Sequence, residues 1–519
     1  MKRIVTILIV LLMTTLSASS QSARFKEAIE IINSNYIDTI NIDRLVDNAI
    51  LKTMLELDPH SNFIPADQVA ATNESLGSSF EGIGIEYLMI DDTLTVQTVV
   101  TDGPSDSAGI LPGDKFIRAD GQNIAGVAMP TTAMQKLLRG KKGTKIRIDL
   151  LRRGVSDTLS FIITRDRIPV TSVDAAYVPE PGIIYVRLSR FAMQSPLELT
   201  KSIHGLSREY PKGVILDLRG NFGGYLHSAG MIANIFLSAG QLIFYTEGLN
   251  SPRRDYNARD NGLYPVGPLV VLVDENSASA SEIVAGAVQD WDRGLIIGRR
   301  TFGKGVIQRP FKLSDGSQIN LTVARYHTPS GRVIQAPYKE GKRDEYYRHQ
   351  YSDRYESGEI FSKDSIKVDD SLEFNTLRLN RKIYGGGGII PDLFVPRDTS
   401  GITPYYTDLV LRGHINSFIN RYVDDHRAEF DPKIPFEEFY ANFDLGDELL
   451  AGLIEHAREA GLEPNYEQIV LSNKLISTRL KALLARAIYG STAYYRVINM
   501  ESDLEFATAM EVIRRWEYY

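Results

Sequence analysis

The chain has 519 residues, enough for roughly two to four domains that each bury a hydrophobic core. Its 43% hydrophobic and 24% charged residues are usual for a folded protein, and its formal net charge of −7 argues against a general nucleic-acid binder. The absence of cysteine excludes disulfides, thiolate metal ligands, a cysteine nucleophile and a lipidated cysteine.

The first residues have the order of a secretory signal peptide. Lys2 and Arg3 precede an apolar run over residues 4–12, and small residues follow. The apolar run is too short to span a bilayer comfortably, because about 20 apolar residues are needed. We therefore expect residues 1–22 to be a signal peptide, with a short membrane anchor as the alternative. This predicts export to the periplasm or cell envelope.

The next two segments differ in periodicity. Residues 23–75 are predicted to be helical, because apolar residues recur at three- and four-residue intervals. Residues 76–166 instead combine short strands, such as "LTVQTVV" and "KIRIDLLRR", with turn-rich connectors and a short helix. This second pattern predicts a small β-rich module.

Residues 167–400 alternate strands and helices. The apolar strands "GIIYVRLSRF", "GVILDLRG" and "PLVVLVD" are each followed by a helical pattern, which is typical of a sheet covered on both faces. Residues 338–382 are charged, rich in tyrosine and without clear periodicity, and we interpret them as a surface insertion. Residues 401–519 are predicted to form a mainly helical extension. The sequence thus predicts an α/β multidomain protein.

A candidate nucleophile lies in the segment "SASASE", at the turn between "PLVVLVD" and the following helix. Ser279 and Glu282 form a capping box, which is by itself a sufficient reason for a serine at this position. A serine on a strand-to-helix turn is also well placed for catalysis, because nearby helix N–H groups can stabilise an oxyanion. The pattern alone leaves both interpretations open.

Two glycine-rich segments favour catalysis. In "TFGKGVIQ" Lys304 lies between two glycines, which allow close backbone packing; a solvated surface lysine is the alternative. In "DLRGNFGG" Gly220, Gly223 and Gly224 follow a buried strand and can offer backbone N–H groups, unless they only form a tight turn. Strand ends of an α/β sheet meet at one crevice, so these groups predict a serine–lysine hydrolase site. The lysine is a base only when neutral, a state that burial favours.

These motifs, in this order, resemble those of the carboxy-terminal processing, or tail-specific, serine proteases. The resemblance covers about residues 24–397 and includes "YHTPSGRVIQ" and "GGGGIIPDLFVP" as the closing segments of the protease domain. It implies Ser279 as nucleophile, Lys304 as base and Gln308 as the residue that orients the base. Positions four apart in an extended segment share a face, so Gln308 can reach the lysine amine. Phe222 stands where the family usually has proline.

The resemblance also implies an oxyanion site, formed by the N–H groups of Ala280 and of Gly223 or Gly224. Some members of the family are described with a charge-relay aspartate at the position of Asp290. A helix rises about 1.5 Å per residue, which places Asp290 about 16 Å from Ser279 along the axis. We therefore interpret Asp290 as structural or as lying C-terminal to the site.

The β-rich module resembles the PDZ domain that these proteases carry. "FEGIGIEY" is similar to its carboxylate-binding loop, in which Gly82, Ile83, Gly84 and Ile85 would present N–H groups to the terminal carboxylate of a peptide. A hairpin with a glycine bend is the alternative.

The leading hypothesis is an endopeptidase that recognises the C-termini of unfolded or C-terminally exposed polypeptides, membrane-associated ones included. A catalytically inactive PDZ-containing peptide-binding protein and a hydrolase of small amides or esters are the alternatives. We expect no metal or organic cofactor, because the mechanism needs none and the 8 histidines lack metal-ligand spacing. No nucleic acid is expected. The insertion and the helical extension are candidates for gating, homo-oligomer formation or adaptor binding.

Overall fold

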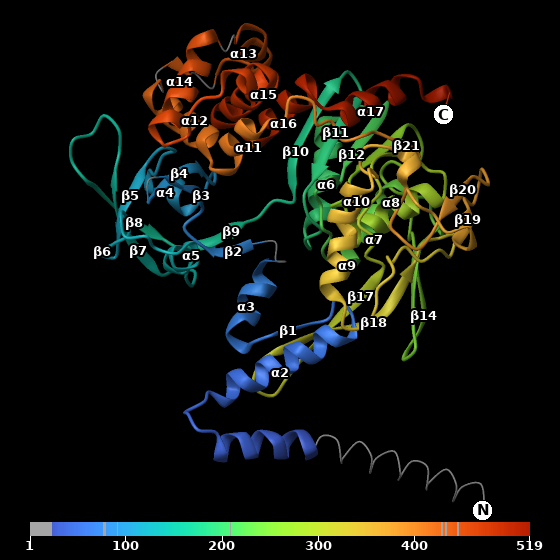
Figure 1. The fold of residues 1–519 in the computed structure, drawn as a ribbon. Coiled ribbons are helices and arrows are strands. Elements are labelled where there is room, and N and C mark those ends of the chain that lie inside the picture. Colours follow the sequence, from blue (N-terminus) through green and yellow to red (C-terminus); the bar gives the residue numbers. More distant parts are fainter. Residues whose placement is uncertain are drawn as a thin grey trace, which may run out of the picture. The chain divides into compact units, whose positions relative to one another are not determined.

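The computed structural model describes residues 23–75, 79–90, 92–207, 209–426, 429–430, 433–443 and 446–518 (Figure 1). The expected signal peptide, residues 1–22, lies outside the described residues. The chain forms two compact units. One contains residues up to 70 together with 308–322 and 338–347, and the other contains residues 71–307, 323–337 and 348–519.

The N-terminal region is helical with a short strand. Its helices cover residues 23–35, α2 (Ile42–Leu57) and α3 (Ala66–Ser75). The Asp58 carboxylate accepts the N–H of Ser61 at 2.8 Å and turns the chain from the end of α2 into β1 (Asn62–Ile64). β1 pairs antiparallel with β18 (Gln318–His327), so a segment expected to be helical also contributes a strand.

The β-rich module has a mixed core of strands and short helices. Its sheet has the order β3 (Ile85–Ile90), β4 (Thr93–Val99), β5 (Lys115–Ala119), β7 (Lys145–Leu151) and β8 (Leu159–Thr164), and β6 (Gln122–Asn123) pairs with β5. Its helices are α4 (Pro104–Ala108) and α5 (Thr131–Leu138). Leu94, Phe116 and Ile148 lie fully buried at its centre. β2 (Ser79–Gly82) pairs with β9 (Asp166–Pro169), which brings the two ends of the module side by side.

The α/β core is built on a six-stranded sheet. Its order is β10 (Val173–Glu180), β11 (Ile183–Leu188), β12 (Gly213–Asp217), β15 (Leu269–Val273), β16 (Leu295–Gly298) and β21 (Leu393–Phe394). β10 runs antiparallel to β11, and all the other pairs are parallel. One face packs on α6 (Ser195–Leu206), α7 (Leu226–Phe236) and α8 (Ala280–Asp290).

The opposite face of this sheet is covered by the C-terminal helix α17 (Leu504–Arg514). Phe506, Met510 and Ile513 pack there on Tyr185 and Val270. Helices therefore cover both faces of the sheet, as expected, but the helix on one face comes from the predicted C-terminal extension after residue 400. An amphipathic pattern shows that a helix has an apolar face, not which sheet that face will meet.

A second sheet, the insertion and the C-terminal helices complete the chain. β13 (Leu242–Gly248) pairs with β14 (Ser251–Asn257) and β18, and β17 (Val306–Lys312) pairs with β18. The insertion contains α9 (Arg343–Gln350), α10 (Ser352–Glu356) and the hairpin of β19 (Glu373–Asn375) with β20 (Lys382–Tyr384). The helical extension contains α11 (Pro404–Leu411), α12 (His414–Asp425), α13 (Phe436–Asn442), α14 (Gly446–Glu459), α15 (Tyr466–Tyr489) and α16 (Ser491–Glu501). Among the described helices, none combines the length and the apolar character that a membrane span requires.

Candidate active site

Ser279 lies on a sharp turn between β15 and α8, as the sequence predicts. It is the N-cap residue of α8, with φ of 56° and ψ of −109°. A positive φ is uncommon for a residue other than glycine, and such strained positions cluster at functional sites. The Ser279 side chain is half-buried at the start of the helix, where a nucleophile can meet a substrate.

The two flanking serines are occupied by structural hydrogen bonds. The Ser277 hydroxyl donates to the Leu218 carbonyl at 2.8 Å, and the Ser281 hydroxyl donates to the Asn221 carbonyl at 2.8 Å. Both serines are fully buried. Their hydroxyls tie the turn to the chain that follows β12, which distinguishes them from the half-buried Ser279.

Glu282 connects two segments: the turn that carries Ser279 (the serine turn) and the loop that carries Lys304 (the lysine loop). Its fully buried carboxylate accepts the N–H of Ser279 at 2.8 Å, of Gly303 at 2.7 Å and of Lys304 at 2.9 Å. It also accepts the hydroxyl of Thr301 at 2.6 Å. Burial raises the pKa of the Glu282 carboxyl, and these hydrogen bonds oppose the rise. The sequence indicates Glu282 only as a capping residue, whereas three of its four contacts lie in the lysine loop.

The glycines around Lys304 allow the close packing that the sequence predicts. A Cβ at Gly305 would lie 2.6 Å from the Gln335 N, and one at Gly303 would lie 3.1 Å from the Ala336 Cβ. The Gly303 carbonyl accepts the Ala336 N–H at 2.8 Å, and the Gly305 N–H donates to Gln335 Oε1 at 2.9 Å. Lys304 is half-buried on a backbone fixed on both sides.

The glycine loop lies directly against the serine turn. A Cβ at Gly223 would lie 2.9 Å from the Ser279 Cβ and 3.0 Å from the Ala280 N, so only glycine fits. The Gly223 N–H donates to Asn221 Oδ1 at 2.9 Å. The structure thus brings Ser279, Ala280 and the loop together, but Gly223 uses its N–H within the loop. The oxyanion assignment itself stays a prediction.

The residues before the glycine loop form a buried ionic cluster that sequence reasoning missed. Asp217 accepts hydrogen bonds from Arg187 at 2.8 Å, Arg219 at 2.7 Å and the Tyr185 hydroxyl at 2.6 Å. Burial alone would raise the pKa of Asp217, but the two guanidinium groups hold it well below its usual range. Arg219 also donates to Asp503 at 2.7 Å, which anchors the loop to the start of α17. The sequence signal that could have indicated this cluster is the pair of Asp217 and Arg219 in the segment "DLR".

The insertion holds the lysine loop from the other side. Arg354 of α10 is only 4% exposed, and it donates to the Thr301 carbonyl at 3.1 Å and the Arg300 carbonyl at 2.5 Å. It also donates to Glu359 at 2.7 Å, which in turn accepts a hydrogen bond from Arg300 at 2.7 Å. The insertion, which the sequence indicates as a surface segment, thus contributes a buried arginine that holds the loop carrying Lys304. We call these contacts of Arg354 the clamp.

Two other predicted residues have clear positions. Asp290 is fully buried and accepts hydrogen bonds from Arg332 at 2.7 Å and the Ser330 N–H at 2.8 Å, contacts that agree with a structural role. Gln308 lies on β17, and its Nε2 is buried without a hydrogen-bond partner in the described part of the chain. The orienting role of Gln308 stays a prediction.

The predicted carboxylate loop connects β2 with β3. Gly84 has φ of 77°, and a Cβ there would lie 3.0 Å from Ile168 Cδ1. The carbonyls of Ile83 and Gly84 accept the N–H groups of Ser105 and Val100, each at 3.0 Å. The loop is therefore held from the module's interior through its carbonyls. Binding of a carboxylate by its N–H groups stays a prediction.

Comparisons with known proteins match family models to three segments of the chain. The model of peptidase family S41 matches residues 182–341, and that of the PDZ domain matches residues 82–163. A family of unknown function, DUF8443, matches residues 405–490. A fold with a serine on a strand-to-helix turn and these two matches defines a serine peptidase with a peptide-binding PDZ domain.

The curated relatives place the chain within that class. It is 36% identical to the carboxy-terminal-processing protease of Bartonella bacilliformis over 61% of this chain and 73% of the relative. It is 35% identical to the carboxy-terminal processing protease CtpA of Bacillus subtilis, over 61% of this chain and 68% of the relative. The solved photosystem II D1 C-terminal processing protease is 30% identical, with 60% of this chain and 89% of that chain covered at a TM-score of 0.34. The chain belongs to the carboxy-terminal processing proteases of peptidase family S41.

Within the described residues, no group of three or more acidic or histidine side chains is arranged to hold a metal ion. The expectation that no cofactor is needed stays a prediction.

Proposed function

We propose that this protein is an endopeptidase in which Ser279 is the nucleophile and Lys304 the general base. The observation that carries this proposal is the Glu282 carboxylate, which bonds the backbone N–H of Ser279 at 2.8 Å and of Lys304 at 2.9 Å. A buried group that fixes two segments through these two residues supports a shared chemical role for them, because catalytic groups require a rigid supporting shell.

The proposed reaction proceeds in two halves. Ser279 Oγ attacks the carbonyl carbon of the scissile peptide bond while its proton passes to Lys304 Nζ. The N–H groups of Ala280 and the glycine loop stabilise the oxyanion; Gly224 is favoured, because the Gly223 N–H is held by Asn221. The C–N bond then breaks and Lys304 protonates the leaving amine. Water hydrolyses the acyl-enzyme by the same route, with Gln308 orienting the lysine.

We infer that the substrates are exported polypeptides that are cut near their C-termini. The PDZ domain would bind the terminal carboxylate at the loop of Gly82, Ile83, Gly84 and Ile85. The N-terminal sequence, typical of a signal peptide, supports a location in the periplasm or cell envelope. Cell fractionation and N-terminal sequencing of the mature protein test this location.

Incubation of the purified protein with an unfolded protein, followed by mass spectrometry of the fragments, tests the catalytic proposal. Ser279→Ala is expected to produce no fragments. Lys304→Arg is expected to be inactive as well, because a guanidinium stays protonated. An active Lys304→Arg variant rules out the dyad. A folded wild-type protein that binds peptides but yields no fragments would support the peptide-binding alternative.

A further inference from the structure

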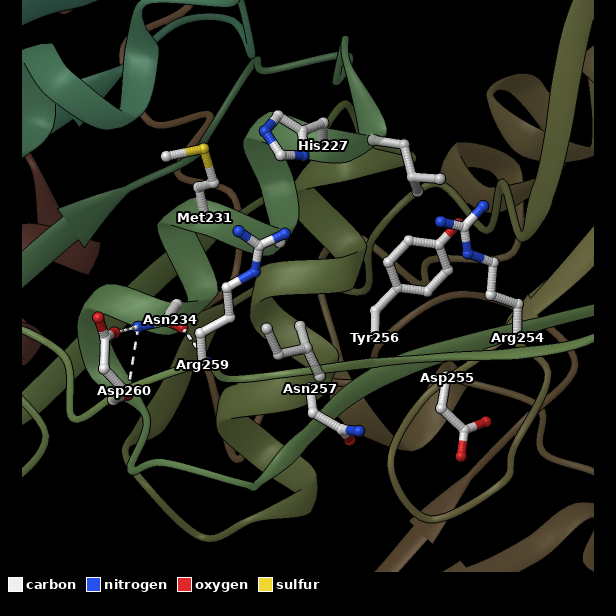
Figure 2. Close-up of a pocket in the computed structure, with 12 residues that line it drawn as sticks. His227, Met231, Asn234, Arg254, Asp255, Tyr256, Asn257, Arg259 and Asp260 are labelled. Atoms are coloured by element: carbon white, nitrogen blue, oxygen red, sulfur yellow. Dashed lines mark hydrogen bonds between the residues drawn. The ribbon is translucent and has the colours of Figure 1, made fainter.

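A cavity of about 570 Å³ lies between α7 and the hairpin of β13 and β14 (Figure 2). Leu226, Met231, Ile243 and Tyr256 give it apolar walls. None of the residues assigned to catalysis or to carboxylate binding lines it. Its mixture of apolar and charged walls suits a segment of polypeptide better than a small, uniformly polar molecule.

The cavity begins beside the candidate active site. α7 starts at Leu226, two residues after Gly224, and a Cβ at Gly223 would lie 2.9 Å from the Ser279 Cβ. The lining residues of α7 run from Leu226 to Asn234. At 1.5 Å per residue this face is about 12 Å long, the span of about four extended residues. A polypeptide whose scissile bond lies at Ser279 can therefore continue into the cavity.

The charged groups of the cavity favour an anionic occupant. Arg254 and Tyr256 alternate with Arg253 and Asp255 along β14, so the two pairs face opposite sides of the strand. Asp255 points away from Arg254 and Tyr256 in Figure 2 and accepts a hydrogen bond from Arg253 at 2.8 Å. The guanidinium of Arg254 lies 5.3 Å from the Tyr256 ring centroid.

The second arginine of the cavity is held from α7. Asn234 accepts the Arg259 N–H at 2.8 Å and donates to the Asp260 carboxylate at 3.0 Å. This anchors the backbone of Arg259, whose guanidinium extends toward Met231 and His227 in Figure 2. The Asp260 carboxylate lies on the other side of Asn234, where it is already hydrogen-bonded. Two guanidinium groups thus face a space with apolar walls.

We propose that this cavity is a substrate subsite that selects an acidic side chain next to apolar residues, close to the scissile bond. This inference rests on the proposed function, since the occupant is the polypeptide substrate. Arg254 and Arg259 pair with the carboxylate, and the neighbouring apolar side chains pack on Met231, Ile243 and Tyr256. The PDZ domain reads the end of the chain, whereas this subsite reads the sequence around the cut.

Binding in the Ser279→Ala background tests the subsite without catalysis. The probes are fluorescein-labelled octapeptides of leucine, alanine and serine that carry one glutamate or one glutamine at each position in turn. Their C-termini are amidated, so that the PDZ domain has no carboxylate to bind. Fluorescence anisotropy is expected to show about fivefold tighter binding for the best glutamate peptide than for its glutamine partner, the size usual for partly exposed charge pairs.

Substitutions of the two arginines decide whether the cavity is responsible for the preference for glutamate over glutamine. Arg254→Gln/Arg259→Gln is expected to bring the glutamate-to-glutamine ratio close to one, and Arg254→Lys/Arg259→Lys to retain most of it. Arg253→Gln, on the opposite face of β14, is the matched control and is expected to keep the ratio. A ratio that survives in the double glutamine variant, or no glutamate preference in the parent, overturns the proposal. Cleavage by the enzyme with Ser279 intact is scored separately, so a failure of the dyad leaves this readout valid.

Discussion

The carboxylate of Glu282 accepts the backbone N–H of Lys304 at 2.9 Å, although the two residues are 22 positions apart in the sequence. The same carboxylate accepts the N–H of Ser279 at 2.8 Å. One buried side chain therefore holds the backbone of the candidate nucleophile and that of the candidate base. A change at Glu282 is expected to displace both residues together.

Glu282→Gln is expected to lower kcat by about 100-fold and to destabilise the fold by about 2 kcal/mol. The amide offers one acceptor oxygen in place of two, so at least one of the four bound donors loses its partner. Peptide cleavage and thermal unfolding measure the two effects. Glu356→Gln, at an exposed position of α10, is the control. A folded Glu282→Gln enzyme with normal kcat would contradict the positioning role.

The three serines of the turn are expected to separate activity from stability. Ser279→Ala should lose all cleavage and keep its fold. Ser277→Ala and Ser281→Ala should each lose about 1–3 kcal/mol of stability, because a buried carbonyl loses its donor, and should retain more activity. Differential scanning calorimetry beside a cleavage assay distinguishes these outcomes. If Ser281→Ala is the inactive variant and Ser279→Ala cleaves, the nucleophile assignment is wrong.

The lowered pKa of Asp217 predicts a dependence of stability on pH. A carboxyl whose pKa is lower in the folded state stabilises the fold above its unfolded value of about 3.9 and loses that contribution as the pH falls. Asp217→Asn is expected to cost about 3–5 kcal/mol near neutral pH, because Arg187 stays buried without this carboxylate and Arg219 keeps only its partners near the start of α17.

The difference in unfolding free energy between wild type and Asp217→Asn is expected to narrow below about pH 4. Denaturant titrations across the acid range measure it, with Asp364→Asn as an exposed control. A difference that stays constant down to acid unfolding would show that Asp217 is not the linked group.

Arg354→Ala tests the clamp on the lysine loop. It removes hydrogen bonds to the carbonyls of Thr301 and Arg300 and the hydrogen bond from Arg354 to Glu359. We expect kcat to fall about tenfold and residues 299–305 to exchange amide hydrogens faster, because the loop loses its buried support. Arg348→Ala, an exposed arginine of α9, should change neither. If the Arg354→Ala variant folds and the amide hydrogens of residues 299–305 exchange at an unchanged rate, Arg354 does not hold the loop.

The sequence predicts which residues carry the chemistry of the candidate site, but it does not predict the contacts that hold these residues in place. Motif order was enough to select Ser279, Lys304 and the glycine loop, and the contact of Gly223 with the serine turn agrees with that selection. The three contacts that Glu282 makes in the lysine loop join distant segments, which no local pattern reveals. Arg354 lies in a charged stretch that is typical of a solvated surface, although its guanidinium is buried.

The last prediction concerns the PDZ domain. Amidation of a substrate's C-terminus is expected to lower its cleavage, because the loop from Gly82 to Ile85 then has no anion to bind. Apolar terminal residues should be preferred, since strand addition places the last side chain in a pocket. Measurement of kcat/KM for free-acid and amidated forms of one peptide tests this. Equal kcat/KM values for the two forms would indicate that the PDZ domain is only a spacer.

The PDZ domain can act either by tethering the substrate, which raises its effective concentration, or by blocking the site when empty. Deletion of residues 76–166, with a short flexible linker in their place, separates the two. A tether predicts slower cleavage of long substrates by the deletion variant. A gate predicts faster and less selective cleavage, because removing the domain also removes the block. Amidation should have no effect on the deletion variant in either case, since the carboxylate loop is gone.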